Sequence, residues 1–348
     1  MPAGEILICH CALRLPLGLY GTCRARTQGF RLPPTGPRDS LLRMSEPKEV
    51  HFYLEDGLLN SARAGSHNFI GKIVSVLTTA GFKVAFHGNS AAEMASSLTR
   101  PGYSMFHMEN PPTDRGLTFR RVYHYPFWAI EPTNERWNWR VANTLFDPSE
   151  TDPAEAAKFY RRWQTRLFGT APDKATRDGF VYIPLQGKLL ERRSFQLSSP
   201  IEMIMAVLQH DPKRQVVATL HPKETYSRDE QKRLDQLQER FAHLQLRTGG
   251  MEPLLQGCDY VVTQNSSAAF NGFFFGKPCV LFAKSDFHHI ATGVENLDVA
   301  AAIDTVAGTR PDFARYIHWF WQQMSINAGR EGAEAKIKAS LQRAGWPV

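Results

Sequence analysis

Short apolar runs alternate with longer amphipathic segments along most of the chain. Val50–Leu54 is a short apolar run that ends at Glu55-Asp56-Gly57, which predicts a β-strand. After a polar loop, Ser66 is suited to cap a helix that reaches about Thr79, and Lys83–Phe86 predicts the next strand. A strand, a helix and a strand in this order form a βαβ unit, so we expect a parallel sheet.

The same alternation recurs in the second half. Gln215–Leu220 is a β-branched run, and Ser227 with Glu230 has capping-box spacing at the head of a helix that reaches about Leu244. The remaining predicted elements are the strands Phe180–Leu185, Tyr260–Thr263 and Cys279–Ala283 and the helices Ala154–Phe168, Ile201–Gln209, Ala268–Phe275 and Pro311–Ala344. Gly276 is suited to end the helix Ala268–Phe275. This order predicts an α/β fold of two Rossmann-like halves that face a central cleft.

The same pattern suggests a division of the chain into five segments. Residues 1–43 are rich in Arg and Pro and lack a sustained period, which favours an unstructured leader or a start codon upstream of the true one. An organelle-targeting peptide or a basic arm is the functional alternative. The other four segments are an N-terminal Rossmann-like domain at 44–150, a linker helix and loop at 151–178, a C-terminal Rossmann-like domain at 179–310 and C-terminal helices at 311–348.

Charge and cysteine content restrict the partners and the compartment. Of the formal net charge of +7, +4 lies in residues 1–43, so the body of the chain, residues 44–348, carries only +3. This charge is too small to indicate a nucleic-acid partner. Cys258 and Cys279 are the two cysteines of the body, which favours a reducing cytoplasm over a disulfide framework. No apolar run approaches the roughly 18 to 20 residues that a membrane-spanning helix needs.

The aromatic stretch Tyr123–Trp139 fits neither the helical nor the strand period. It is suited to form an acceptor-binding wall in the cleft. Packing in the core and between the domains is the alternative, and it is the commoner role of such a cluster.

Polar residues follow the predicted strands at three points. In open α/β sheets, ligands bind beyond the carboxyl ends of the strands. Asp56 is a candidate general base, with Glu55 and Gly57 beside it as contacts to the ligand. His221 is a candidate donor to a phosphate, with Lys223 nearby. A carboxylate that caps a loop and a histidine that binds a neighbouring loop are the structural alternatives.

The third point is the serine pair before the helix Ala268–Phe275. Ser266 and Ser267 offer hydroxyl donors next to free backbone N–H groups, an arrangement suited to phosphate, although a helix-capping serine is the commoner role. Gln186 and Asn265 are candidate contacts to the nucleotide or the sugar.

The sequence has no recognisable metal motif. It contains no HExxH, no spaced set of Cys and His, no Asp-x-Asp and no P-loop, so we expect no metal. His288-His289 does not change this expectation, because adjacent residues on a strand point to opposite faces.

Taken together, the three motifs EDG, HP and SS resemble the motif set of bacterial sialyltransferases and capsule polymerases, which are GT-B enzymes that use CMP-activated sugars. The segment that contains the serine pair is similar to that of capsule polysaccharide synthesis proteins, including Kdo transferases; it reads CDYVVTQNSSAAFNGFFFGKPCVLFA. The resemblance covers Phe180–Ala283, and Val50–Gly57 by motif. Residues 90–170 align with nothing.

This resemblance implies an inverting, metal-independent glycosyltransferase that needs no cofactor and uses a CMP-sugar of the Kdo or sialic-acid type as co-substrate. By the match of motifs, Asp56 is the general base, His221 stabilises the departing CMP phosphate, and Ser266 and Ser267 bind that phosphate. The resemblance also implies that the domain at 44–150 is on the acceptor side and that the domain at 179–310 binds the nucleotide-sugar. The acceptor is expected to be a glycan or glycolipid in capsule or surface polysaccharide biosynthesis. The expected location is the cytoplasm, with peripheral contact to the inner membrane or a polysaccharide export complex.

Two alternative functions remain open, and the sequence differs from the family pattern at one place. A CDP-glycerol-type phosphotransferase also has an HP turn and a serine pair, and a non-catalytic nucleotide-sugar-binding subunit would carry the same motifs. The departure is the helix after the serine pair, which here carries Asn271 and four Phe and so predicts different packing beneath the donor site.

Overall fold

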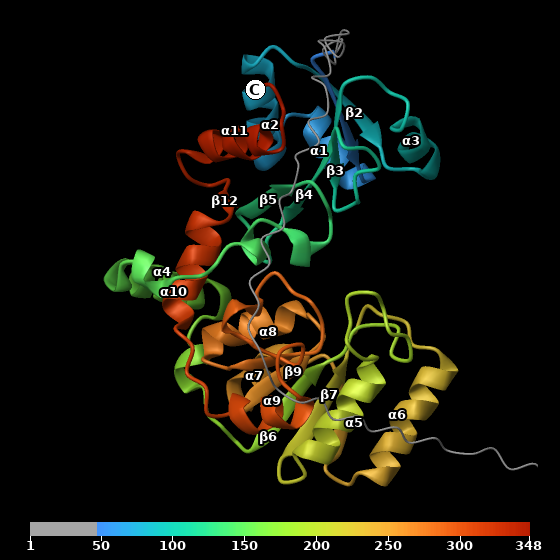
Figure 1. Ribbon diagram of the computed structural model, residues 1–348, viewed down its shortest axis with the longest axis vertical. Coiled ribbons are helices and arrows are strands. Elements are labelled where there is room, and N and C mark those ends of the chain that lie inside the picture. The colour runs from blue at the N-terminus through green and yellow to red at the C-terminus, as the bar shows by residue number, and fades with distance from the viewer. Residues whose placement is uncertain (1–46) are drawn as a thin grey trace, which may run out of the picture. The chain divides into compact units, whose positions relative to one another are not determined.

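The computed structural model describes residues 47–348 (Figure 1). The predictions for residues 1–43 therefore lie outside the described residues. The described chain is an α/β protein with two six-stranded sheets.

The first sheet has the strand order β12-β5-β4-β3-β1-β2. The four strands β2, β1, β3 and β4 are parallel, whereas β5 and β12 are antiparallel to their neighbours. The parallel pair of β1 and β2 confirms the predicted βαβ unit. The strands are β1 (Glu49–Leu54), β2 (Lys83–Gly88), β3 (Tyr103–His107), β4 (Gly116–Arg121), β5 (Phe127–Glu131) and β12 (Ile326–Asn327).

Helices α1 (Asp56–Arg63), α2 (Asn68–Thr79) and α11 (Ala333–Arg343) pack on one face of this sheet, and α3 (Ala91–Ser96) follows β2. The prediction of a loop before Ser66 is wrong, because α1 buries Leu59 and Ala62 against the sheet. The predicted cap is also wrong. Ser66 closes the end of α1 through hydrogen bonds to the Ser61 carbonyl, and His67 caps α2 instead, its Nδ1 accepting from the Ile70 N–H at 3.1 Å.

The second sheet is parallel throughout, with the order β11-β10-β9-β6-β7-β8. It confirms the strands expected from the sequence and adds β8 and β11. The strands are β6 (Phe180–Pro184), β7 (Gln215–Leu220), β8 (Leu244–Thr248), β9 (Tyr260–Thr263), β10 (Cys279–Leu281) and β11 (Thr292–Gly293).

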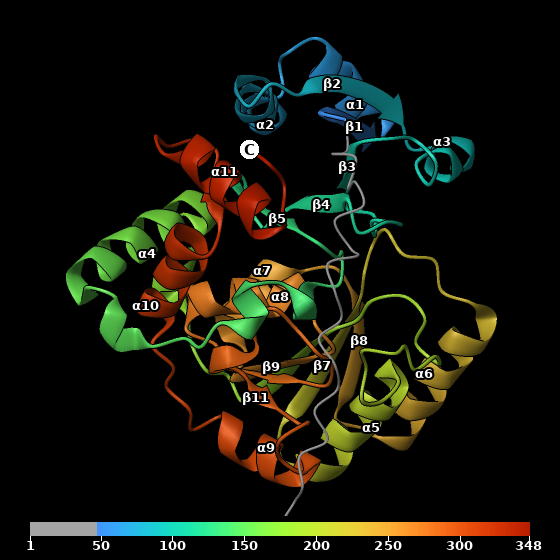
Figure 2. The ribbon, with the colours of Figure 1, turned by 45° about the horizontal axis from the view of Figure 1, so that its top comes forward.

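Helices cover both faces of the second sheet (Figure 2). On one face lie α5 (Pro200–His210), α6 (Arg228–Arg240) and α9 (Val299–Val306), and on the other α7 (Met251–Gly257) and α8 (Ser267–Gly272). The capping box of Ser227 and Glu230 is confirmed. The predicted end of α6 near Leu244 is wrong, because Leu244 is buried as the first residue of β8 and pairs with Val216.

The chain ends on the first sheet. Helix α10 (Phe313–His318) lies beside α4 (Pro153–Phe168) in both ribbon views, and a π-helical turn over Trp319–Gln323 leads from it to β12 (Figures 1 and 2). The expectation that Pro311–Ala344 is all helical is therefore wrong at β12, which pairs with β5. The domain boundaries given above stay predictions.

An aromatic cluster forms the core between α4, α8, α10 and the strand β5. Phe127 and Trp139, from the stretch Tyr123–Trp139, are fully buried in it. So are the four Phe that follow the serine pair, none of which is more than 4% exposed. For these residues the packing interpretation is correct, whereas Tyr123 and Trp137 lie at the edge of a cavity.

Candidate functional site

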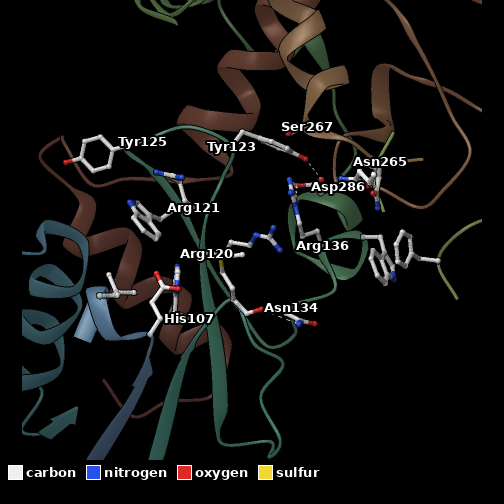
Figure 3. A pocket seen from close by; sticks show the side chains of 18 of the residues that line it. His107, Arg120, Arg121, Tyr123, Tyr125, Asn134, Arg136, Asn265, Ser267 and Asp286 are labelled. Atoms are coloured by element: carbon white, nitrogen blue, oxygen red, sulfur yellow. Dashed lines mark hydrogen bonds and ion pairs between the residues drawn. The ribbon is translucent and has the colours of Figure 1, made fainter. Parts of the chain in front are cut away.

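A cavity of about 750 Å³ is lined by residues from both sheets and from the loops that follow their strands (Figure 3). From the first sheet and its loops come Glu55, Leu58, His67, His107, Met108, Arg120, Arg121, Tyr123, Tyr125, Trp128, Asn134, Arg136 and Trp137. From the second come Gln186, Arg193, Phe195, Asn265, Ser267, Ser285 and Asp286. A space of this size suits a ligand as large as a nucleotide-sugar.

Of the residues singled out in the sequence, four line this cavity and five do not. Glu55, Gln186, Asn265 and Ser267 are among the lining residues. The five that are not are Asp56, Gly57, His221, Lys223 and Ser266.

The carboxylates after β1 have different surroundings. Glu55 precedes α1 and lines the cavity, while Asp56 is the first residue of α1 and is exposed. Glu55 acts electrostatically on His107, which also lines the cavity. Burial lowers the pKa of His107, and the negative charge of Glu55 opposes that shift in part.

The serine pair divides its roles. Ser266 is buried and caps α8, its Oγ accepting from the Ala268 N–H at 3.3 Å, which is the structural alternative stated for a serine at this place. Ser267 is exposed and lines the cavity. Asn265 is held beside it by donating from Nδ2 to the Lys284 carbonyl at 3.1 Å.

The His221 loop lies next to the loop that carries Gln186. Nδ1 of His221 accepts from the Lys223 N–H at 3.2 Å, so in its neutral form the ring carries its proton on Nε2. A Cβ at Gly187 would stand 2.6 Å from a carboxylate oxygen of Glu224, so the two loops approach each other closely at this point. The imidazole is exposed and can donate to a ligand.

A buried ion pair that the sequence did not reveal joins the two sheets at the cavity (Figure 3). Asp286 accepts from Nε and Nη2 of Arg136 at 3.1 and 2.7 Å and from the Tyr123 hydroxyl at 2.6 Å. The Arg136 guanidinium also lies 4.1 Å from the centre of the Tyr123 ring. Burial alone would lower the pKa of Arg136, but Asp286 and Tyr123 more than offset it, so this pKa is raised.

The Phe-rich helix supports this arrangement from below. The Tyr123 ring is stacked on Phe270 with centroids 4.1 Å apart, and His124 is hydrogen-bonded through Nε2 to Asn271 Oδ1 at 2.8 Å. The departure noted in the sequence is therefore where α8 meets the loop after β4. These contacts of Phe270 and Asn271 in α8 hold the loop that carries Tyr123, which lines the cavity.

The cavity lining is rich in positive charge. Besides Arg136 it includes Arg120, Arg121 and Arg193, whereas Glu55 and Asp286 are the carboxylates among the lining residues. Residues 120 and 121 end strand β4, so the rule of strand ends would have found them, had that strand been predicted.

In the part of the chain that the structure describes, no group of three or more His, Cys, Asp and Glu side chains is arranged to hold a metal ion. His288 and His289 lie on a 3₁₀ turn, not on a strand as the sequence argument assumed. Their rings stack on each other at 4.2 Å, and His289 binds the Tyr316 hydroxyl and the Thr144 carbonyl.

No model of a protein family matches the sequence, and no curated protein matches it. Among solved structures, the chain is similar to KpsC, a beta Kdo 2,7 transferase of Thermosulfurimonas dismutans, with 12% identity and a TM-score of 0.51 over 85% of this chain and 99% of that one. Weaker similarity is found to the UDP-GlcNAc 2-epimerase of Neisseria meningitidis bound to UDP-GlcNAc (12% identity, TM-score 0.35, 85% and 99% covered). The wall teichoic acid polymerase TagF is more distant still (10% identity, TM-score 0.27, 86% and 90% covered).

An identity of 12% with a TM-score of 0.51 establishes the fold alone. Together with the two sheets, it defines the chain as an α/β protein of the GT-B type with two Rossmann-like domains, as the sequence predicted. Within residues 47–348, no helix is both long and apolar enough to cross a membrane.

Proposed function

We propose that this protein is an inverting glycosyltransferase that moves a sugar of the Kdo or sialic-acid type from a CMP-activated donor to a glycan or glycolipid acceptor. The observation that carries the proposal is the arginine-lined cavity of about 750 Å³ to which both sheets of a GT-B fold contribute. The motif resemblance and the fold likeness to a Kdo transferase support the same substrate class.

The charge of the cavity supports an anionic donor. Four arginines face two carboxylates among the lining residues, and one of those carboxylates, Asp286, is already paired with Arg136. The surplus attracts a phosphate or carboxylate from solution and holds it by charge-assisted hydrogen bonds. A neutral sugar ligand would leave these guanidinium groups without counter-charge.

In the proposed mechanism, Asp56 removes a proton from the acceptor hydroxyl as its oxygen attacks the anomeric carbon. A carbon–oxygen bond forms on one face of the sugar, the bond to the CMP oxygen breaks on the other, and the configuration inverts. We assign the donation to the phosphate, as it gains charge, to Nε2–H of His221 and the Ser267 hydroxyl, and we keep Ser266 and Lys223 as the further phosphate-binding residues of the motif match. A monophosphate leaving group carries less charge than a diphosphate, so these donors suffice and the proposal includes no metal or cofactor.

Glu55 has a different proposed role from Asp56. We assign it to ligand contact, together with Gly57, Gln186 and Asn265, and we assign the acceptor hydroxyl to Asp56, which is exposed beside the cavity-lining Glu55 but does not itself line the cavity. The two carboxylates are neighbours in sequence, so each is the matched control for the other.

The test measures binding first and transfer second. Calorimetry with CMP, CMP-Kdo, CMP-sialic acid, CDP-glycerol and UDP-GlcNAc is expected to show binding of the CMP compounds. Failure of the wild-type protein to bind any CMP compound contradicts the proposal, and binding of CDP-glycerol alone points to the phosphotransferase instead.

Release of CMP then tests the base. Asp56→Asn is expected to slow release by at least about 100-fold while CMP affinity changes by less than about threefold. Glu55→Gln is expected to slow it by less than about 10-fold. If the two variants exchange these results, the base is Glu55. Binding of donor without any turnover on glycan or glycolipid acceptors would favour a non-catalytic subunit.

The remaining proposals concern the cell. We propose that the protein acts in surface polysaccharide assembly in the cytoplasm, with peripheral contact to the inner membrane or an export complex. Fractionation of cells with antibody detection tests this directly, since recovery in a periplasmic fraction would contradict it.

A further inference from the structure

One arginine of the cavity differs from the others in its surroundings. Arg120 ends strand β4 one residue before Arg121, and its side chain extends toward Arg136 (Figure 3). It is partly buried and lines the cavity.

Two of the other cavity arginines have compensation that Arg120 lacks, because Arg136 is paired with Asp286 and Arg121 is exposed to water. Arg193 lies 4.9 Å from the centre of the Phe195 ring, but its Nε and Nη2 are buried and make no hydrogen bond within residues 47–348. Within residues 47–348, the side chain of Arg120 makes no hydrogen bond or ion pair. Burial and the neighbouring charge of Arg136 lower its pKa, and Tyr123 and Asp286 oppose this in part.

This arrangement is unfavourable in the ligand-free protein. Removing a guanidinium from water without a partner costs free energy, and a second guanidinium nearby adds repulsion. An anion in the cavity would remove both penalties. The planar fork of arginine fits the two oxygens of a carboxylate or phosphate better than a lysine ammonium does.

We propose that Arg120 binds a second oxyanion of the substrates, distinct from the donor phosphate that the His221 and Ser267 side chains hold. The inference rests on the proposed function for the identity of the first anion, and it makes Arg120 a determinant of specificity for acidic substrates. The oxyanion is either a carboxylate on the transferred sugar or a phosphate on the acceptor. Both bind by the same chemistry.

The experiment uses the whole protein with the donor-phosphate site filled. Wild type, Arg120→Gln, Arg120→Lys and the control Arg228→Gln, an exposed arginine at the start of α6, are saturated with CMP and titrated with free Kdo or with inorganic phosphate. Arg120→Gln is expected to weaken binding of at least one probe by about 10- to 100-fold, with CMP affinity unchanged within about threefold. Arg120→Lys is expected to fall between, and Arg228→Gln to match wild type.

The probes separate the two sources. A loss confined to Kdo assigns the carboxylate of the sugar, a loss confined to phosphate assigns an acceptor phosphate, and a loss of both supports the shared site. If Arg120→Gln binds both probes as the wild type does, the proposal is overturned.

Two readouts keep this result independent of other failures. If CMP does not bind to the wild type, the proposed function fails, yet titration of the CMP-free protein with the same probes still tests Arg120. Thermal unfolding without ligand tests a purely structural role. Because Arg120 has no partner to lose, Arg120→Gln is expected to melt at the same temperature as wild type or higher, and a lower melting temperature contradicts the proposal.

Discussion

The buried pair of Arg136 and Asp286 gives the sharpest prediction about stability. Asp286 is 2% exposed and satisfies two donors of Arg136 and the hydroxyl of Tyr123. Asp286→Ala removes the counter-charge and leaves the guanidinium, 19% exposed, with no carboxylate. Removing one partner of a buried pair costs about 3 to 5 kcal/mol, and the residual exposure of Arg136 places this case near 3 kcal/mol.

The measurement is urea unfolding followed by circular dichroism and by tryptophan fluorescence. With a slope of about 3 kcal/mol/M, the midpoint is expected to fall by about 1 M. The matched control is Glu191→Ala, which breaks the pair of Lys188 and Glu191, where both side chains are 60% exposed. Its cost is expected to lie below about 1 kcal/mol.

A double variant separates a lost pair from a stranded charge. Arg136→Met with Asp286→Leu removes both charges, so its cost is expected to be at least about 2 kcal/mol less than the sum of the single variants. If Asp286→Ala shifts the midpoint no more than Glu191→Ala does, or if the single costs simply add, the ion pair does not join the sheets energetically as argued.

Three further predictions concern pH and backbone. Burial raises the pKa of Glu131 to about 7, so the folded protein keeps a proton that the unfolded chain loses near 4.5. The free energy of unfolding therefore falls by roughly 3 kcal/mol as pH rises from 4.5 to 7. Glu131→Gln is expected to remove that loss in urea titrations at several pH values. Burial lowers the pKa of His289 to about 4, so the stability that the neutral ring contributes is present above pH 6.5 and is lost as pH falls toward 4. His289→Gln is expected to remove this loss of stability in acid, which is on the order of 2 kcal/mol because the ring is partly exposed. Unchanged acid sensitivity of the variant would contradict the prediction. The two effects oppose each other in the wild type, so either variant alone is expected to show a steeper pH dependence than the parent between pH 4.5 and 6.5. Gly276 ends the Phe-rich turn at a φ of +66°, a backbone angle that an L side chain disfavours. Gly276→Ala is therefore expected to lower the free energy of unfolding by about 1 kcal/mol. The control Gly71→Ala, inside α2 with open space at its Cβ, is expected to leave the free energy of unfolding no lower than in the wild type.

The elements that the sequence predicted correctly are those with strong local signals. The strand Gln215–Leu220 was found from its β-branched run, and α6 from the capping box of Ser227 and Glu230. The stop at Gly276 follows from the ease with which glycine adopts a left-handed backbone. These features depend on residues within a few positions of one another, so an α/β fold of two Rossmann-like halves followed from their order along the chain, and the motif resemblance added the GT-B type.

The errors lie where distant parts of the chain decide the local structure. Strand β12 is two residues long and forms because it pairs with β5, about 200 positions earlier. No local sequence pattern predicts that pairing. Helix α1 looked like a polar loop, since its burial depends on two small or apolar positions against the sheet. Strands β3, β4 and β5 are absent from the sequence prediction, and Arg120 was missed with β4. Strand β5 lies in the aromatic stretch that fits neither period.

For the candidate site, the sequence by itself determined which polar residues follow the strands, because neighbouring residues determine where a strand ends. It could not determine which of them face one cavity, and the structure divides them between lining and non-lining positions. Only the tertiary structure brings Asp286 to Arg136, 150 residues away, and leaves the Arg120 side chain near them with no hydrogen bond or ion pair to any residue that the structure describes. Charges interact through space, not along the chain, so their pairing is decided by the packing of the two sheets.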